Sequence, residues 1–136
     1  MSHKSAGILP VCNGKLFMLK EKGKLADFGG KRKLLETPED TAWREFAEET
    51  NGLGSRADLL RVLAEFKNKS GHVVFICEMK KPLVGQEFQV VDLKKAVPSF
   101  YELHMTNQIN GRLKVKGLCS FFSKFEAIDM APKFIF

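Results

Sequence analysis

Short apolar runs separated by turn-forming residues dominate the first two thirds of the chain, and this pattern predicts strands. The run from Val73 to Cys77 is apolar at every position, which indicates a central strand covered on both faces. Asn13 and Gly14 separate two runs and form a strong hairpin signal, because both tolerate the positive φ of a type I′ turn. The predicted strands are Ser5–Val11, Lys15–Lys20, Leu59–Lys67, His72–Met79 and Gln86–Leu93.

A helix is predicted in the middle of the chain. Thr37 is a good N-cap, and Pro38 suits the first helical position, where its missing N–H would have no partner. Asn51 and Gly52 both accept the left-handed conformation that commonly ends a helix. The sequence therefore predicts a helix from Pro38 to about Thr50.

A second helix is predicted to begin at Pro98, because Ser99 and Glu102 have the spacing of a capping box. It should end near Asn110, and beyond Gly111 the pattern no longer distinguishes helix from strand. No internal repeat, low-complexity segment or linker interrupts the chain. A length of 136 residues suits one domain with one core, so a single domain over residues 1–136 is expected.

Composition and charge point to an intracellular protein with an anionic partner. Hydrophobic residues make up 44% of the chain and charged residues 28%, as in ordinary folded proteins. The net charge of +6 favours capture of anions such as a nucleotide or an RNA end, although the cations are spread along the chain. No run approaches the roughly 18 apolar residues that span a bilayer, and the first residues lack the apolar part of a secretory signal. A cytoplasmic protein without a membrane partner is expected.

The cysteines and histidines do not indicate a metal site. The three cysteines are an odd number without a C-x-x-C pair, which argues against a disulfide framework and against structural zinc. Reduced and mostly buried thiols are expected at Cys12, Cys77 and Cys119. The three histidines are scattered along the chain, and surface positions are expected for them: His3, His72 and His104.

One face of the first predicted helix concentrates negative charge. Each helical residue advances by about 100°, so Glu45, Glu48 and Glu49 share a face. Residues that can pack against a sheet gather on a different face: Ala42, Trp43, Phe46 and Thr50. The three carboxylates repel one another, and Arg44 is the only cation between residues 38 and 50.

A divalent cation is the expected partner of this face. Oxygen ligands on a rigid element select a hard ion, Mg²⁺ first and Mn²⁺ second. Such an ion would neutralise the oxygens of a diphosphate, while a nearby carboxylate orients or deprotonates the attacking water. Gly29 and Gly30 would let the backbone approach the same place closely or adopt a positive φ. A solvated acidic helix is the plain alternative.

The spacing of these residues resembles the Nudix box, the motif of a hydrolase family that cleaves diphosphate linkages. Gly30 is followed after five residues by Glu36, and after seven more by the run Arg44–Glu49. The family's next glycine position holds Asn51, and Gly52 arrives one residue late. The resemblance implies an α/β fold, the Nudix-like α/β/α sandwich around a mixed central sheet with mostly antiparallel flanking strands.

The resemblance also implies roles for single residues. Glu45, Glu48 and Glu49 are similar to the family's metal-binding glutamates, with the carbonyl of Gly29 as a further ligand. Glu45 and Glu48 are also expected among the catalytic residues, Glu45 as the candidate general base. Arg44 joins them as the cation that orients a box glutamate. Supporting positions are expected at Glu36 and Gly30, and further candidates for substrate contact are Lys31, Arg32 and Glu102.

The box does not identify the substrate. Residues 27–31 are similar to the strand entry of Nudix enzymes that hydrolyse oxidised nucleoside triphosphates. This favours a normal or oxidised nucleoside triphosphate, cut to a monophosphate and pyrophosphate. Removal of phosphates or a cap from an RNA 5′ end is an alternative, as is hydrolysis of ADP-ribose or dinucleoside polyphosphates. A non-catalytic nucleotide-binding module that regulates a partner is an alternative from another class, and a dimer is left open.

Overall fold

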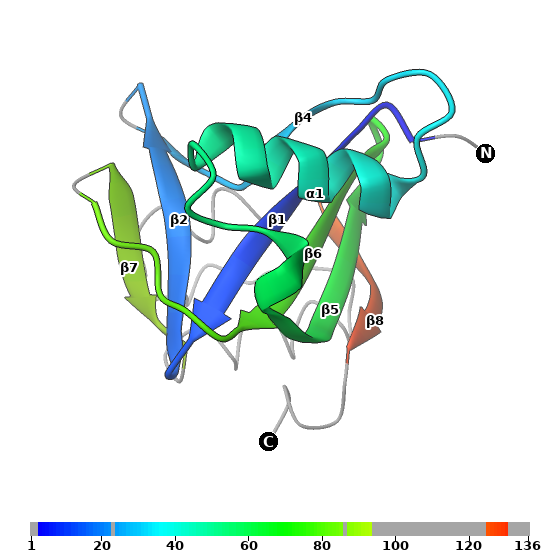
Figure 1. Cartoon of the computed structure of the whole chain (residues 1–136). Coiled ribbons are helices and arrows are strands. Elements are labelled where there is room, and N and C mark those ends of the chain that lie inside the picture. The colour runs from blue at the N-terminus through cyan, green and yellow to red at the C-terminus, as the bar shows by residue number, and fades with distance from the viewer. Residues whose placement is uncertain (1–2, 23, 86, 94–124, 131–136) are drawn as a thin grey trace.

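The computed structural model describes residues 3–22, 24–85, 87–93 and 125–130 (Figure 1). These residues form one α-helix, one short 3₁₀ helix and eight strands. The strands are β1 (Ser5–Cys12), β2 (Lys15–Glu21), β3 (Lys24–Ala26), β4 (Phe28–Lys31), β5 (Leu59–Asn68), β6 (His72–Met79), β7 (Phe88–Asp92) and β8 (Phe125–Met130). The helices are α1 (Pro38–Glu49) and η1 (Arg56–Asp58).

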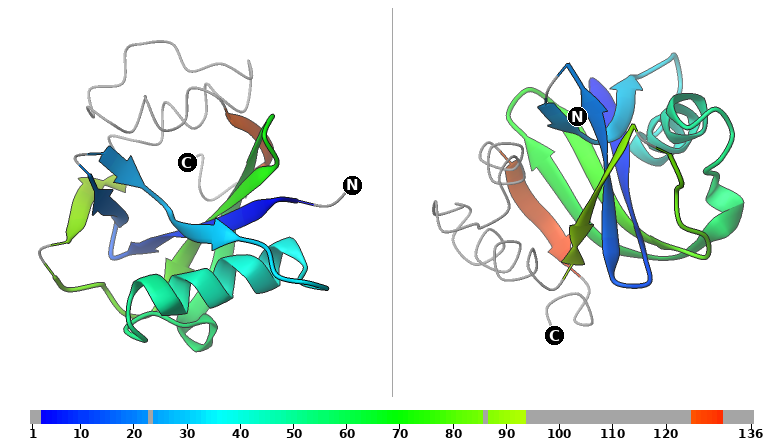
Figure 2. Two further views of the ribbon diagram at one scale, coloured as in Figure 1. Left: turned by 90° about the horizontal axis from the view of Figure 1, so that it is seen from above. Right: turned by 90° about the vertical axis from the view of Figure 1, so that its left-hand side faces the viewer.

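All the described strands belong to one mixed sheet. Its order is β3-β2-β1-β6-β5-β8, with β4 also paired to β1 and β7 to β2. The central pair, β1 and β6, is parallel, and every other pairing is antiparallel. Helix α1 lies across one face of this sheet, as the view from above shows (Figure 2). The predicted α/β class with a mixed sheet is therefore confirmed, while the second predicted helix, which begins at Pro98, lies outside the described residues.

The predicted hairpin and central strand are both present. Asn13 and Gly14 have φ values of 51° and 74°, so both central residues of the turn are left-handed. Strand β6 lies between β1 and β5, and the side chains of Val74, Ile76 and Cys77 are fully buried in it. The strands predicted in the regions of β5 and β7 are found as well. Strands β3, β4 and β8 were not predicted, because short pairings and weak periodicity leave little signal in a sequence.

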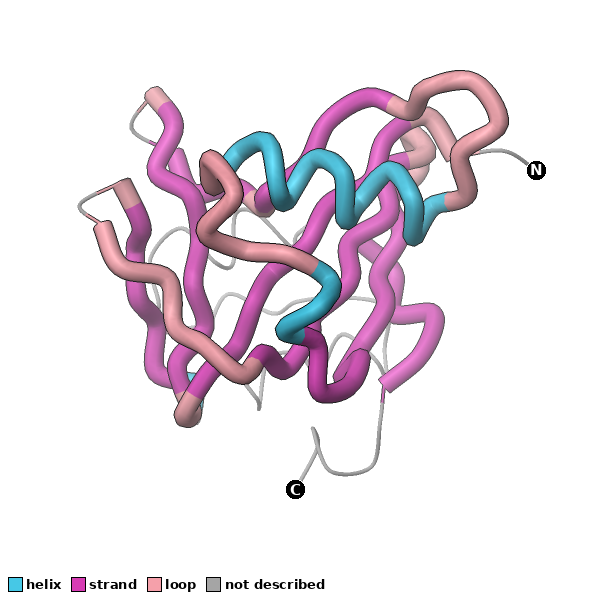
Figure 3. The backbone as a smooth tube through the Cα atoms, viewed as in Figure 1, coloured by secondary structure: helices cyan, strands magenta, loops and turns pink. Residues whose placement is uncertain are grey.

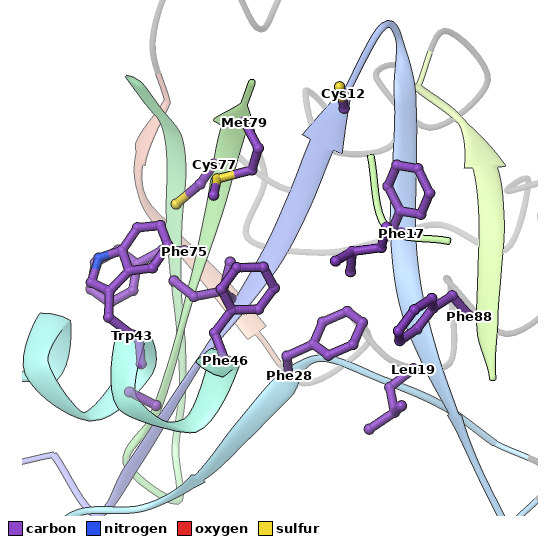
Figure 4. Close-up of a cluster of buried hydrophobic side chains, with 14 of the residues drawn as sticks. Cys12, Phe17, Leu19, Phe28, Trp43, Phe46, Phe75, Cys77, Met79 and Phe88 are labelled. Carbon is purple, nitrogen blue, oxygen red and sulfur yellow. The ribbon is translucent and has the colours of Figure 1, made fainter. Parts of the chain in front are cut away.

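The core on the α1 side is built largely from aromatic rings. The ring centroids of Phe28 and Phe46 lie 5.6 Å apart, and those of Phe28 and Phe88 lie 5.5 Å apart. Trp43 packs edge-on against Phe46 at 5.8 Å and is only 8% exposed, which confirms its predicted core position. Phe28 thus links α1 to β7 (Figure 4).

Both ends of α1 are fixed by the residues that the sequence indicated. The Thr37 hydroxyl accepts a hydrogen bond from the Asp40 N–H, and the Asp40 carboxylate accepts one from the Thr37 N–H, each at 3.1 Å. At the other end Asn51 and Gly52 have φ values of 52° and 81°. The helix therefore begins at Pro38 as predicted and ends at Glu49, one residue before the predicted end.

The two glycines before α1 lie in a strand. Gly29 and Gly30 pair with Gly7 and Ala6 of β1, and neither has a positive φ. The sequence left close approach and positive φ as alternatives, and the structure selects close approach. Among the described residues no helix is long and apolar enough to cross a membrane. Cys12 and Cys77 are buried free thiols, and Cys119 lies outside the described residues.

Candidate active site

The guanidinium of Arg44 connects the helix to the loop and strand before it. Its Nε donates to Glu36 Oε2 at 2.7 Å, and its Nη1 donates to Glu45 Oε1 at 2.7 Å. The same Nη1 lies 3.3 Å from Glu48 Oε2, and Nη2 donates to the Lys31 carbonyl at 2.8 Å. One side chain therefore fixes two carboxylates, reaches a third and holds the end of β4 against α1.

Glu36 serves this arrangement from the loop between β4 and α1. Its Oε1 accepts hydrogen bonds from the Lys33 N–H at 2.7 Å and from the Thr41 hydroxyl at 3.1 Å. The hydrogen bond from Arg44 lowers the pKa of Glu36 to about 2. The pKa of Arg44 is raised in turn, chiefly by its hydrogen bond to Glu36. The pair stays fully ionised at neutral pH and forms the rigid side of the site.

Gly30 has a specific reason to be glycine. A Cβ atom at this position would lie 2.6 Å from Glu45 Oε1 and 2.5 Å from Glu45 Oε2. At Gly29 a Cβ would lie 2.7 Å from the Ala6 carbonyl oxygen. Both glycines therefore allow close packing, and Gly30 gives the Glu45 carboxylate its place against β4.

Negative charges from three elements act on Glu49. The pKa of Glu49 is raised, first by burial and then by the negative charges around it. Those charges belong to Glu21, Glu45, Glu48 and Asp27. Glu45 and Glu48 share the helix with Glu49, whereas Glu21 ends β2 and Asp27 precedes β4. Sequence reasoning missed these last two, because no spacing rule relates strand ends to a helix that follows them in the chain.

The donor set of this face fits a hard divalent cation. All the side chains whose negative charge acts on Glu49 offer carboxylate oxygens, which Mg²⁺ and Mn²⁺ prefer. Across the described part of the chain, no three acidic, histidine or cysteine side chains stand close enough to hold an ion as they are placed. Glu45 and Glu48 face Arg44 instead, but the Glu48 side chain is 54% exposed and can turn. Closing a coordination shell therefore requires these side chains to turn from their present positions.

The other residues singled out in the sequence have different places. Lys31 is exposed and contributes its carbonyl to Arg44, and Arg32 is half-buried and donates its N–H to the Lys4 carbonyl at 3.0 Å. Neither contact is with the acidic face. Glu102 lies outside the described residues.

The histidine expectation was wrong for His3 and incomplete for His72. His3 is 8% exposed, with its Nε2 at 2.9 Å from the Thr41 hydroxyl, because it packs beside the start of α1. His72 is half-buried on β6, where its Nδ1 lies 2.6 Å from Ser5 Oγ and its Nε2 lies 2.8 Å from Asp27 Oδ2. These contacts join residues that are 38, 67 and 45 positions apart, so no local sequence pattern predicts them.

Comparison with known proteins identifies the family. The model described as NUDIX domain matches residues 1–107. The chain belongs to the Nudix family. A comparison with curated proteins found no match. The family assignment confirms the resemblance carried by residues 30–49 and, with the structures below, supports a pyrophosphohydrolase enzyme.

Solved Nudix structures share the fold. The Ap4A hydrolase of C. elegans is 17% identical, with a TM-score of 0.56 over 72% of this chain and 86% of that one. The Nudix hydrolase RenU of M. smegmatis is 25% identical, with a TM-score of 0.50 over 71% and 74%. A bifunctional NMN adenylyltransferase/ADP ribose pyrophosphatase of Francisella tularensis, complexed with AMP and a Mn ion, is 16% identical. Its TM-score is 0.51, and the match covers 68% of this chain and 34% of that protein.

Proposed function

We propose that this Nudix enzyme hydrolyses the diphosphate linkage of a nucleoside diphosphate derivative, with a normal or oxidised nucleoside triphosphate as the favoured substrate. Water attacks a phosphorus of the substrate's triphosphate group, and a nucleoside monophosphate and pyrophosphate are released. One observation carries this proposal. Arg44 binds Glu45 and reaches Glu48 on the helix that also carries Glu49, and negative charges on β2 and the β3–β4 connection act on Glu49 as well.

Each residue of the face has a part in this reaction. Glu45, Glu48, Glu49 and the Gly29 carbonyl would hold Mg²⁺, or Mn²⁺ in its place. The bound ion would neutralise phosphate oxygens and polarise the phosphorus. Glu45 is the candidate base, which takes the proton of the attacking water. Arg44 positions Glu45 through the 2.7 Å bond to Oε1.

Glu36 acts through Arg44. Its two oxygens hold Nε and Nη2 of the guanidinium at 2.7 Å and 3.0 Å, which leaves Nη1 directed at Glu45. A lysine in place of Arg44 could not make this forked contact. Gly30 completes the arrangement, because it provides the space that the Glu45 carboxylate occupies.

The structural neighbours support the substrate class at a coarse level. One is described as an Ap4A hydrolase, and another as an ADP ribose pyrophosphatase complexed with AMP and a Mn ion. Each name contains a nucleoside joined to a phosphate chain. This chain's preference among such compounds is part of the proposal.

A substrate panel with one matched pair of variants tests the proposal. Purified protein with Mg²⁺ is incubated with normal and oxidised nucleoside triphosphates, ADP-ribose, dinucleoside polyphosphates and capped RNA, and products are separated by chromatography. Glu48→Gln should lose at least about 100-fold of the activity. Glu39→Gln is the control, because Glu39 is exposed on the first turn of α1.

The outcomes separate the alternatives. Release of monophosphate and pyrophosphate from a nucleoside triphosphate, lost in Glu48→Gln and kept in Glu39→Gln, supports the proposal. Nucleotide binding without turnover would indicate a regulatory module. Cleavage of capped RNA alone would indicate an RNA-end enzyme. Equal turnover by Glu48→Gln would refute the metal role of the acidic face.

A further inference from the structure

Three segments that are distant in sequence meet at one end of the sheet. Strands β1 and β4 are antiparallel and pair Ser5 with Lys31 at this end. Beyond the strands, the Lys4 N–H donates to the Gly71 carbonyl at 2.9 Å, and the Arg32 N–H donates to the Lys4 carbonyl at 3.0 Å. The start of β1, the end of β4 and the β5–β6 turn therefore form one edge. Its cations, called here the basic edge, are Lys4, Lys31, Arg32, Lys33, Lys67 and Lys69.

The charges of the basic edge face solvent. Its five lysines are exposed, and Arg32 is half-buried. None of the six forms an ion pair with a carboxylate within the described part of residues 3–93. The nearby carboxylate of Glu36 is held by Arg44, and Asp40 caps the helix. The edge thus has positive charge available for an anionic partner.

Two leucines project from the loop that follows Lys31 and carries Arg32 and Lys33. Leu34 is 85% exposed and Leu35 is 89% exposed. The loop extends past the N-terminal end of α1 (Figure 3), on the side where the N-terminus lies in Figure 1. Leu34 and Leu35, called here the leucine tip, are therefore adjacent aliphatic side chains presented to solvent next to three consecutive cations.

Leu35 is also held in a backbone conformation that disfavours leucine. Its φ is 65°, in the left-handed region where glycine is strain-free and a bulky side chain is not. The turn is closed by the Glu36 N–H, which donates to the Lys33 carbonyl at 3.2 Å, and by the Lys33 N–H, which donates to Glu36 Oε1 at 2.7 Å. Because this leucine is strained and almost fully exposed, it does not stabilise the fold, and a contact outside the molecule would explain it.

We propose that the basic edge and the leucine tip together bind the surface of an anionic lipid bilayer. Clustered lysines and arginines are attracted to anionic headgroups, and adjacent aliphatic side chains enter the boundary of the acyl chains. Single-stranded RNA fits less well, because its bases stack on aromatic rings and the leucine tip is aliphatic. The sequence alone offers no reason to expect this partner, since the cations are spread along the chain and meet only in the fold.

Vesicle co-sedimentation of the full chain tests this proposal. Wild type should bind vesicles of phosphatidylcholine mixed with phosphatidylserine, bind phosphatidylcholine alone weakly, and dissociate as salt is raised. Leu35→Gly should lower vesicle binding by about tenfold, because it removes a leucine that would be partly buried in the bilayer. The same variant should melt at the wild-type temperature or above it, because the left-handed strain is removed. Lys33→Glu with Lys69→Glu should lower binding by at least about 25-fold, since each cation contributes about fivefold.

A matched control lies at the opposite end of the sheet. Lys80→Glu with Val84→Ser changes one exposed cation and one side chain that is 79% exposed, after the end of β6. It should bind vesicles as wild type does. Wild-type binding by Leu35→Gly, equal loss in the control, or binding of single-stranded RNA without binding of vesicles would each overturn the proposal. None of these measurements involves hydrolysis, so a failure of this proposal is distinguishable from a failure of the proposed function.

Discussion

Adding a single methyl group at Gly30 should displace the candidate base, Glu45, without changing that residue itself. In Gly30→Ala the new Cβ would lie 2.5 Å and 2.6 Å from the two oxygens of Glu45. The φ of Gly30 is not positive, so alanine has no backbone strain there. Since the crowded atoms are the end of a flexible side chain, Glu45 rotates away and loses its 2.7 Å bond to Arg44.

The cost in stability can be worked from these contacts. Overpacking costs roughly 1–3 kcal/mol, and a hydrogen bond between charged groups contributes roughly 1.5–3 kcal/mol when buried, less at this partly exposed site. Alanine recovers roughly 0.5–1 kcal/mol over glycine within a strand. A net loss of about 2 kcal/mol follows, which lowers the melting temperature by about 8 °C in a domain of this size. Displacing the base by about 1 Å should cost about 100-fold in turnover.

Two assays and a second glycine separate the local effect from general instability. Thermal denaturation measures the fall in melting temperature. Turnover of the best panel substrate, assayed well below the melting temperature, measures the loss of catalysis. Gly54→Ala is the control, because its Cβ would overlap the Phe46 ring and crowd the core instead. It should be destabilised yet active. If Gly30→Ala keeps wild-type turnover, the placement of Glu45 against β4 is irrelevant to catalysis.

Further variants examine the remaining contacts of α1. Arg44→Lys should lose about 10- to 100-fold in turnover, because one ammonium cannot hold the carboxylates that the guanidinium joins; unchanged turnover would contradict its positioning role. Thr37→Ala should lower the free energy of unfolding by about 1 kcal/mol in a denaturant titration and leave turnover unchanged, since it removes only the cap to Asp40. The pKa of Glu36 is about 2 in the fold against 4.5 ordinarily, so its contribution to stability is complete above pH 4.5 and is lost as the pH falls towards 2. Glu36→Gln should therefore flatten the dependence of the melting temperature on pH in that window, and an unchanged slope would refute this cause.

The elements that the sequence predicted well are those with local signals. The hairpin at Asn13 and Gly14 and the limits of α1 depend on residues within a few positions of one another. The buried strand β6 was predicted because its apolar run is continuous. Strand β8 had no such signal, and its pairing with β5 joins residues about sixty positions apart.

Helical geometry predicted the candidate site only where it lies on α1, and the expectations for Gly29, Gly30 and Glu36 came from the family resemblance. Helical geometry alone groups Glu45, Glu48 and Glu49, because residues three and four apart share a face. The bond from Arg44 to Glu36 spans eight residues and leaves the helix, so its geometry depends on the path of the loop. The His72–Asp27 bond spans 45 residues and requires the sheet register.

Glu21 and Asp27, the two carboxylates that the sequence did not predict, strengthen the case for a metal ion at the acidic face of α1. Three glutamates on a helix face can remain solvated at small cost, because each side chain turns outward. Burial raises the pKa of Glu49 first, and the charges of Glu21 on β2 and Asp27 at the entry to β4 raise it further. A phosphate chain would be repelled from such a face unless a cation accompanied it, so the carboxylates support a metal-dependent reaction more strongly as a group than the box does alone.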